Sequence, residues 1–325
     1  MHLALTTYGS YIRKQGERFI VKVKDDKINV SAKKVESIHI HTGCNLSSNS
    51  IKLAMDYNIP VVFFDKYGNP FSRVWHSKMG STTKIRINQL KYAQNMKGLK
   101  VAVDWIIMKT QKRIKFIKKL ASHRPKKKER LNNFISSLKK EVNQIKNLNY
   151  DYDKKKVEGR IRGLEGSAGK IYFNCLSYLL PKRYEYNGRS MMPAKDKFNA
   201  FLNYSYGVLY SLTEKASIIA GLDPFIGFLH SDNYNKKSFV FDLVEPFRPI
   251  CEEVVFYLFS KRKVNNSHCD EINNGYTLNK KGKKLLITSL NKKFDEKTRY
   301  RKHNMKYRDT IQKEAHFIAN SMIEK

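Results

Sequence analysis

The sequence has few cysteines, and their spacing suits neither a zinc site nor a disulfide framework. Only four are present, Cys44, Cys175, Cys251 and Cys269, and no two form a Cys-x-x-Cys pair. A zinc knuckle takes its thiolates from closely spaced pairs, so this spacing argues against one. The absence of a disulfide framework fits a reducing cytoplasm.

Long apolar runs are also missing. No stretch approaches the roughly 20 apolar residues that a membrane-spanning helix needs, and the start of the chain, up to Thr7, resembles a short strand rather than a signal peptide. Hydrophobic residues still make up 41% of the 325 residues, which is enough for one large or two ordinary globular domains. We therefore expect a soluble, cytoplasmic protein that does not bind membranes.

Acidic residues are scarce relative to basic ones. The chain has 29 Asp and Glu against 63 Lys and Arg, a formal net charge of +34. Such an excess repels itself in the folded state, so an anionic partner is expected to offset it. Nucleic acid is the obvious partner, because phosphate contacts and counterion release dominate its binding. The alternative is a drift in composition, since Lys and Asn are frequent throughout.

Three familiar catalytic signatures do not occur. The chain has no GxxxxGK[ST] loop, no HExxH and no GxSxG nucleophile elbow. Nucleotide-hydrolysing P-loop proteins and zinc-dependent proteases of the HExxH type therefore lack support.

The residues that are present divide the chain into two regions. Short β-branched and aromatic runs predict strands at Leu3–Thr7, Phe19–Val23, Val35–Ile40 and Pro60–Asp65, with a short helix at Ile51–Tyr57. A 3.6-residue period predicts helices over about 85–122, 130–147, 154–180 and 198–220. The polar segment 265–275 is expected to be a loop. The predicted fold class is α+β, with a small N-terminal β-sheet domain over 1–80 and a larger all-α domain over 85–325.

Glu165 is the first candidate site residue. Apolar and small residues stand at −4, +3 and +7 from it, so they share its face of the predicted helix. A carboxylate in such surroundings is costly unless it is paired or bound to a metal ion. The alternative is an ion pair with Arg162, three residues earlier, with the small residues serving helix packing.

His230 is the second candidate, at the end of the apolar stretch Gly221–His230. A neutral imidazole at the boundary between apolar and polar sequence suits a metal ligand or a proton carrier. A histidine with a purely structural role is the alternative.

Asp242 and Glu245 are the third candidate pair, because residues three apart on a helix face the same way. The alternative is a capping box, with Asp242 at the N-cap and Glu245 three residues later. Arg248 is placed to contact a phosphate or to hold a carboxylate. Together these segments put two or three carboxylates and one histidine in a strongly basic helical region. That combination suits Mg²⁺ or Mn²⁺ at a phosphodiester.

These segments resemble the CRISPR-associated integrase-nuclease family, the "protein one" of CRISPR adaptation. The resemblance covers nearly the whole chain and rests on Tyr11–Arg18, Ser50–Asp56, Ile59–Pro70, Glu165–Ala168, Gly221–His230 and Asp242–Pro249. The last two segments, in this order and at this spacing, are highly specific. The joint match outweighs the separate structural explanations of each segment.

The resemblance implies an N-terminal β domain that mediates homodimerisation and a C-terminal helical domain that is catalytic. It implies Glu165, His230 and Glu245 as catalytic metal ligands, with Glu245 where several members have aspartate. Asp242 is implied to support the site by orienting a ligand. The implied partners are double-stranded DNA and a small ferredoxin-like "protein two", which bridges two dimers into a heterohexamer. A nuclease that trims the DNA is a further possible partner.

The activity implied is that of a metal-dependent DNA endonuclease and integrase. The 3′-hydroxyl of a short DNA fragment, the spacer, attacks a phosphodiester at the edge of a CRISPR repeat. Candidates for DNA contacts are Arg86, Lys91, Arg113, Lys126, Lys127, Lys128, Arg162 and Arg248. The alternatives are a stand-alone nuclease for branched DNA in repair, a transposon integrase of the same superfamily, and a non-catalytic architectural DNA-binding protein.

Overall fold

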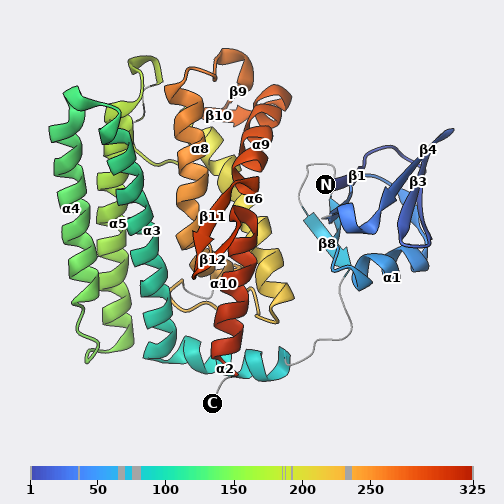
Figure 1. Cartoon of the computed structure of the whole chain (residues 1–325), viewed down its shortest axis with the longest axis horizontal. Helices are drawn as coiled ribbons and strands as arrows, with labels where there is room; N and C mark the ends of the chain where they lie inside the picture. The colour runs from blue at the N-terminus through green and yellow to red at the C-terminus, as the bar shows by residue number, and fades with distance from the viewer. Residues whose placement is uncertain are drawn as a thin grey trace. The chain divides into compact units, whose positions relative to one another are not determined.

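The computed structural model describes residues 2–35, 37–64, 70–74, 82–184, 186, 188–191, 193–230 and 236–323 (Figure 1). The chain divides into two compact parts, an N-terminal unit of residues 1–80 and a C-terminal unit of residues 81–325. Within the described ranges, no helix combines the length and the apolar character that crossing a membrane requires.

The N-terminal unit contains two four-stranded sheets. One has the order β1 (His2–Leu5), β5 (Ser37–Ile40), β7 (Val61–Phe64) and β8 (Pro70–Val74). The other has the order β4 (Asp26–Ser31), β3 (Arg18–Val23), β2 (Ser10–Gln15) and β6 (Cys44–Leu46). Both sheets mix parallel and antiparallel pairs. In the first, β1, β5 and β7 are parallel and β8 is antiparallel to β7. In the second, β2, β3 and β4 are antiparallel and β6 is parallel to β2.

One apolar core serves both sheets of this unit. Ile12 and Phe19 come from one sheet and Ile38 from the other, and all three are fully buried beside Leu53 of helix α1 (Ser48–Asp56). The helix begins after Ser47, whose side chain accepts a hydrogen bond from the backbone N–H of Ser50. A single 3₁₀ turn, η1 (Ala32–Lys34), links β4 to β5.

The C-terminal unit is mostly helical. Its helices are α2 (Thr82–Gln94), α3 (Met96–Ser122), α4 (Lys128–Lys146), α5 (Lys154–Leu179), α6 (Lys197–Ile219), α7 (Ser238–Leu243), α8 (Arg248–Ser260), α9 (Lys280–Asp295) and α10 (Tyr307–Ser321). Its 3₁₀ turns are η2 (Pro125–Lys127), η3 (Lys182–Tyr184), η4 (Glu245–Phe247) and η5 (Asn266–His268). Helices α3, α4 and α5 pack side by side, and α6, α8, α9 and α10 form a second group (Figure 1).

The predicted fold class is confirmed, and the helical unit adds two short antiparallel hairpins. They are β9 (Cys269–Ile272) with β10 (Gly275–Leu278), and β11 (Lys297–Tyr300) with β12 (His303–Lys306). The prediction of a loop over 265–275 is therefore wrong. Only one end of the first hairpin is buried, at Cys269 and Leu278, so its sequence carries no alternating apolar signal. Asn274 makes the turn with φ of 62°, which asparagine tolerates.

Candidate active site

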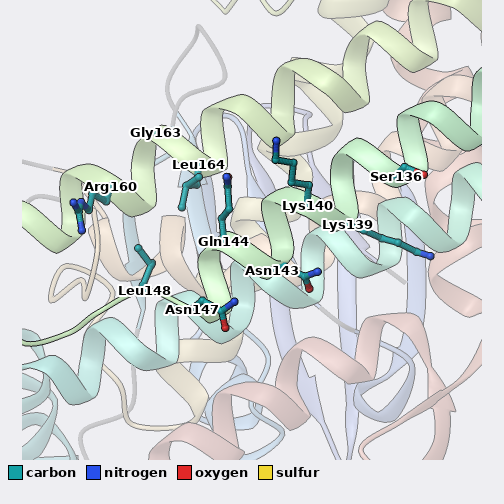
Figure 2. A pocket seen from close by; sticks show the side chains of 10 residues that line it. All are labelled: Ser136, Lys139, Lys140, Asn143, Gln144, Asn147, Leu148, Arg160, Gly163 and Leu164. Carbon is teal, nitrogen blue, oxygen red and sulfur yellow. The ribbon is translucent and has the colours of Figure 1, made fainter.

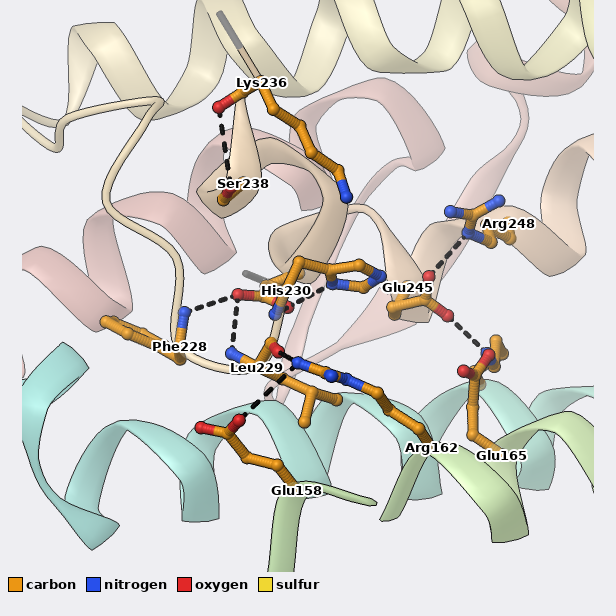
Figure 3. A network of polar contacts seen from close by, with 12 residues as sticks. Glu158, Arg162, Glu165, Phe228, Leu229, His230, Lys236, Ser238, Glu245 and Arg248 are labelled. Atoms are coloured by element: carbon orange, nitrogen blue, oxygen red, sulfur yellow. Dashed lines mark hydrogen bonds and ion pairs between the residues drawn. The ribbon is translucent and has the colours of Figure 1, made fainter. Parts of the chain in front are cut away.

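Glu165 lies on α5, a helix that begins after Asp153, whose side chain accepts a hydrogen bond from the N–H of Lys155. Its side chain is about one-third exposed, and Oε1 lies 2.6 Å from Nζ of Lys109. The alternative pairing with Arg162 is wrong. That guanidinium lies 3.6 Å from Glu158 and donates to the carbonyl oxygen of Leu229 at 2.5 Å, as Figure 3 shows.

Glu245 begins η4, where Pro246 is tolerated because the first residues of a helical turn need no donor. Its side chain is buried, and Oε1 accepts a hydrogen bond from Nε of Arg248 at 2.7 Å (Figure 3). Oε2 accepts a hydrogen bond from Lys109. Burial alone would raise the pKa of Glu245, but the charges of Arg248 and Lys109 outweigh it and lower the pKa to about 2. The carboxylate is therefore ionised, as a metal ligand must be.

Asp242 organises the loop that carries His230. Oδ2 accepts the backbone N–H of Phe228 at 2.6 Å and of Leu229 at 3.1 Å, while Oδ1 accepts the N–H of His230 at 3.2 Å. Oδ1 also lies 2.6 Å from Nδ1 of His230, so Nε2 is the nitrogen left to bind a metal ion. The capping-box alternative is wrong, because Asp242 lies inside α7 and its acceptors serve this loop.

Lys109 of α3 is a site residue that was not predicted from the sequence. Its side chain is 2% exposed, and its ammonium contacts both Glu165 and Glu245. One sequence feature could have identified Lys109 as buried: it lies on the apolar stripe of α3, three residues after Ile106 and four before Arg113. A lysine at such a position needs a buried anionic partner, and both partners are distant in sequence.

The candidate site residues meet at one cavity of about 410 Å³, which Lys109, other residues of α5 and Arg189 also line. Glu165, His230, Glu245 and Arg248 all reach it, whereas Asp242 stands behind His230. A Cβ placed on Gly166 or Gly169 would meet nothing within 4 Å, so these glycines leave space on the cavity wall rather than admit another helix.

The donor set suits a hard or borderline divalent cation, with two carboxylates and one imidazole nitrogen. Among the described residues, however, no group of three His, Cys, Asp or Glu side chains is arranged to hold a metal ion. The ammonium of Lys109 lies between Glu165 and Glu245 and contacts both carboxylates. The residue types fit a divalent ion, although in this structure Lys109 pairs with both carboxylates.

The predicted DNA-contacting residues fall into different environments. Arg113 is corrected: its guanidinium is buried, donates to Glu252 at 3.0 and 2.6 Å, and stacks over Tyr172, so it cannot meet DNA at the surface. Nε of Arg248 donates a hydrogen bond to Glu245, and the Arg248 side chain also lines the cavity. Arg86 is half-buried, 4.0 Å from Asp223. The remaining lysines are exposed or nearly so; they are Lys91, Lys126, Lys127 and Lys128.

A second concave surface lies between α4 and α5 (Figure 2). This α4–α5 groove has a volume of about 950 Å³. Its cations are Lys139, Lys140 and Arg160, and the other lining residues are Ser136, Asn143, Gln144, Asn147, Leu148, Gly163 and Leu164. The groove was not predicted from the sequence, because its cations come from two helices whose pairing the sequence does not reveal.

The comparison with known families decides the identity. The family model described as "CRISPR associated protein Cas1" matches residues 3–292. The chain belongs to the Cas1 family. It is 31% identical over 322 residues to "CRISPR-associated endonuclease Cas1 1" of Archaeoglobus fulgidus, covering 96% of this chain and 93% of that protein. The solved structure of a Cas1 protein from Thermotoga maritima superposes with a TM-score of 0.76 at 20% identity, covering 100% and 97% of the two chains. The resemblance drawn from the sequence is thus confirmed.

Other relatives are named as part of a complex, as a fusion protein or as bound to an integration product. The structure "Casposase bound to integration product" matches with a TM-score of 0.75 at 21% identity, covering 98% of this chain and 91% of that one. The "Cas6-RT-Cas1--Cas2 complex" matches with a TM-score of 0.72 at 19% identity, covering 99% and 35%. A "CRISPR-associated exonuclease Cas4/endonuclease Cas1 fusion" of Leptospira interrogans is 25% identical, covering 85% of this chain and 50% of the fusion. The two structures show the fold alone.

Proposed function

We propose that this Cas1 family member is a metal-dependent DNA nuclease and integrase that inserts short DNA fragments into a CRISPR array by 3′-hydroxyl transesterification. The observation that carries the proposal is the convergence of Glu165, His230 and Glu245 on one cavity of a chain with net charge +34. They come from three separate elements, so their meeting is a property of the fold. A relative of this chain in Archaeoglobus fulgidus is named an endonuclease, which supports phosphodiester chemistry.

In the proposed reaction, the 3′-hydroxyl of the fragment loses its proton to solvent and its oxygen bonds to the phosphorus of a repeat phosphodiester. The bond from that phosphorus to the leaving 3′-oxygen breaks, and the leaving oxygen takes up a proton from solvent. Glu165, Glu245 and Nε2 of His230 would hold Mg²⁺ or Mn²⁺. When bound, the ion supplies charge stabilisation at the phosphate and lowers the pKa of an attacking or leaving oxygen. Asp242 keeps the His230 ring in one tautomer and orientation. Arg248, fixed through Nε on Glu245, presents the rest of its guanidinium to the cavity for a phosphate oxygen.

We assign the DNA path to exposed and partly exposed cations of α4, α5 and the turn before α4. Lys126 and Lys127 lie in η2 and Lys128 begins α4, while the α4–α5 groove adds Lys139 and Arg160. Arg162 lies between this groove and the cavity along α5, one turn before Glu165. Arg86 and Lys91 of α2 remain further candidates. Contacts of this kind bind phosphates, so they should show little sequence preference.

The proposed assembly is a homodimer formed through residues 1–80, bridged to a second dimer by the small ferredoxin-like subunit of CRISPR adaptation. The solved "Cas6-RT-Cas1--Cas2 complex" brings a Cas1 chain together with Cas2, which supports that partner. The fusion protein of Leptospira interrogans joins a Cas1 to a Cas4 exonuclease, which supports a trimming nuclease as an additional partner.

The test is an integration assay with Glu165→Ala as the deciding variant. A labelled short duplex ending in 3′-hydroxyl or 3′-deoxy is mixed with a supercoiled repeat-bearing plasmid, Mn²⁺ and the protein, with and without the small partner. We expect joining only with a 3′-hydroxyl, and a loss of roughly 100-fold or more in Glu165→Ala.

Two other outcomes would replace the proposal. Glu165-dependent nicking without joining under any condition would indicate a repair nuclease for branched DNA. DNA binding that is indifferent to Mn²⁺ and to Glu165→Ala, with no cutting or joining, would indicate an architectural protein.

A further inference from the structure

Lys109 holds the position that a cation would take between the two carboxylates of the cavity. Nζ lies 2.6 Å from Oε1 of Glu165 and also donates to Oε2 of Glu245. The two partners belong to α5 and η4, whereas Lys109 belongs to α3. One ammonium therefore ties three elements of the site together.

This ammonium is not an ordinary surface charge. The Lys109 side chain is 2% exposed, and Glu245 is almost as deeply buried. Burying an ammonium is costly unless an anion pairs with it, and here two carboxylates do so. Without Lys109 and without a metal ion, Glu165 and Glu245 would lose the cation that they share, and Arg248 would remain paired with Glu245.

Lys109 and a divalent ion would compete for the same carboxylate oxygens of Glu165 and Glu245. Magnesium bonds carboxylate oxygens at about 2.0–2.1 Å, so an ion bridging the oxygens that Lys109 contacts would lie in the space of Nζ. The four-carbon stem of lysine allows the ammonium to leave by rotation. Arg248 keeps its hold on Oε1 of Glu245, so that carboxylate would remain oriented when Lys109 moves away.

We propose that Lys109 is a built-in counter-cation that competes with the divalent metal ion for Glu165 and Glu245. The inference rests on the proposed function, because it takes these two residues as metal ligands. In the metal-free protein, Lys109 keeps the carboxylates paired and in place. The ion enters only by displacing the ammonium, so Lys109 sets the metal affinity of the site lower than its ligands alone would give. Lys109 is a positioning residue, since it acts through the carboxylates.

The first experiment measures Mn²⁺ binding by the decrease of the free Mn²⁺ signal in electron paramagnetic resonance. The full chain is titrated as wild type, as Lys109→Met and as Lys115→Met, an exposed lysine of the same helix that controls for the lost charge. Binding by Glu165→Gln is subtracted as background. We expect Lys109→Met to bind Mn²⁺ about tenfold tighter than wild type or more, and Lys115→Met to stay within about twofold of wild type. Equal or weaker binding by a folded Lys109→Met overturns the inference.

A second measurement needs no variant and covers the case in which Lys109→Met fails to fold. Crystals of the wild type are soaked with Mn²⁺ and the anomalous signal is located. We expect the ion at Glu165 and Glu245, with Nζ of Lys109 moved away from both carboxylates. An ion at these ligands with Nζ still on both overturns the inference while leaving the proposed metal site intact. If neither wild type nor Lys109→Met binds Mn²⁺ there, the proposed metal site fails and the inference fails with it.

Discussion

Glu314 of α10 is a carboxylate that the fold surrounds with donors. It is fully buried and accepts hydrogen bonds from Nε1 of Trp105 at 2.8 Å, from the hydroxyl of Tyr300 at 2.7 Å, and from Arg301 at 2.6 and 2.9 Å. Burial alone would raise its pKa, but the hydrogen bonds from Arg301, Trp105 and Tyr300 outweigh burial and lower the pKa. This network fixes the hairpin β11–β12 and α10 against α3.

We predict that Glu314→Gln lowers the free energy of unfolding by about 3 kcal/mol at pH 7, because Arg301 and the buried donors lose their charged partner. A carboxylate with a lowered folded-state pKa stabilises the protein above its unfolded pKa. This stabilisation is lost as the pH falls through the folded value. The difference between wild type and Glu314→Gln in urea unfolding should therefore shrink as the pH falls below about 4.5. A difference that is constant with pH would show that the charge of Glu314 is not what stabilises this network.

Single residues also show where prediction from sequence succeeds and fails. Glu165, His230 and Glu245 stand out because acidic or imidazole groups are unexpected beside apolar and small residues. Lys109 and Arg113 do not stand out as internal cations, because α3 itself carries many other Lys residues and the chain is basic throughout. Their acidic partners are 56 to 139 residues away. Only the packing of α3 against other elements reveals that these two cations are internal.

At the scale of elements, the segment from Gly227 to His230 depends on a close approach that only glycine permits. A Cβ on Gly227 would lie 2.7 Å from Cβ of Ser238, 2.9 Å from the carbonyl oxygen of His230 and 3.0 Å from the carbonyl carbon of Ser238. Two of these atoms are backbone, so they cannot rotate away. Gly227 thus lets the His230 loop lie directly against the start of α7, the helix that carries Asp242.

We predict that Gly227→Ala destabilises the protein by about 1–3 kcal/mol and reduces Mn²⁺-dependent joining more than it reduces DNA binding, because His230 is displaced from Asp242. The matched control is Gly159→Ala in α5, where a Cβ meets nothing within 4 Å. That change should stabilise the helix by about 0.5–1 kcal/mol and leave joining unchanged. Equal activity in the two variants would contradict the role assigned to this contact.

The elements themselves were largely predictable from the sequence. The 3.6-residue period located α4, α5 and α6 to within a few residues, because each buries a continuous apolar stripe. The strands β2, β4, β6 and β8 and both C-terminal hairpins were missed. In β2, β4 and β9 the exposed positions outnumber the buried ones, so pairing with a neighbouring strand, rather than an apolar pattern, defines these strands.

For the whole molecule, the net charge of +34 predicts strongly salt-dependent DNA binding. We predict that replacing Lys139, Lys140 and Arg160 of the α4–α5 groove together by Gln lowers the slope of log affinity against log salt by up to about 3, since each lost phosphate contact removes about 0.9. Replacing Lys280, Lys281 and Lys284, exposed on α9, changes the total charge equally and should have a smaller effect. An equal loss in both triple variants would show diffuse attraction instead of a defined path.

The candidate site draws Lys109 from α3, Glu165 from α5, His230 from a loop and Glu245 from η4, which packs on α3. During synthesis, a nascent chain that has left the ribosome only through α5 therefore holds one carboxylate and its lysine, without the imidazole or the second carboxylate. Domains generally fold as units as they emerge. A nascent chain that ends before η4 therefore lacks the complete candidate site, so the proposed chemistry would have to wait until Glu245 has been added.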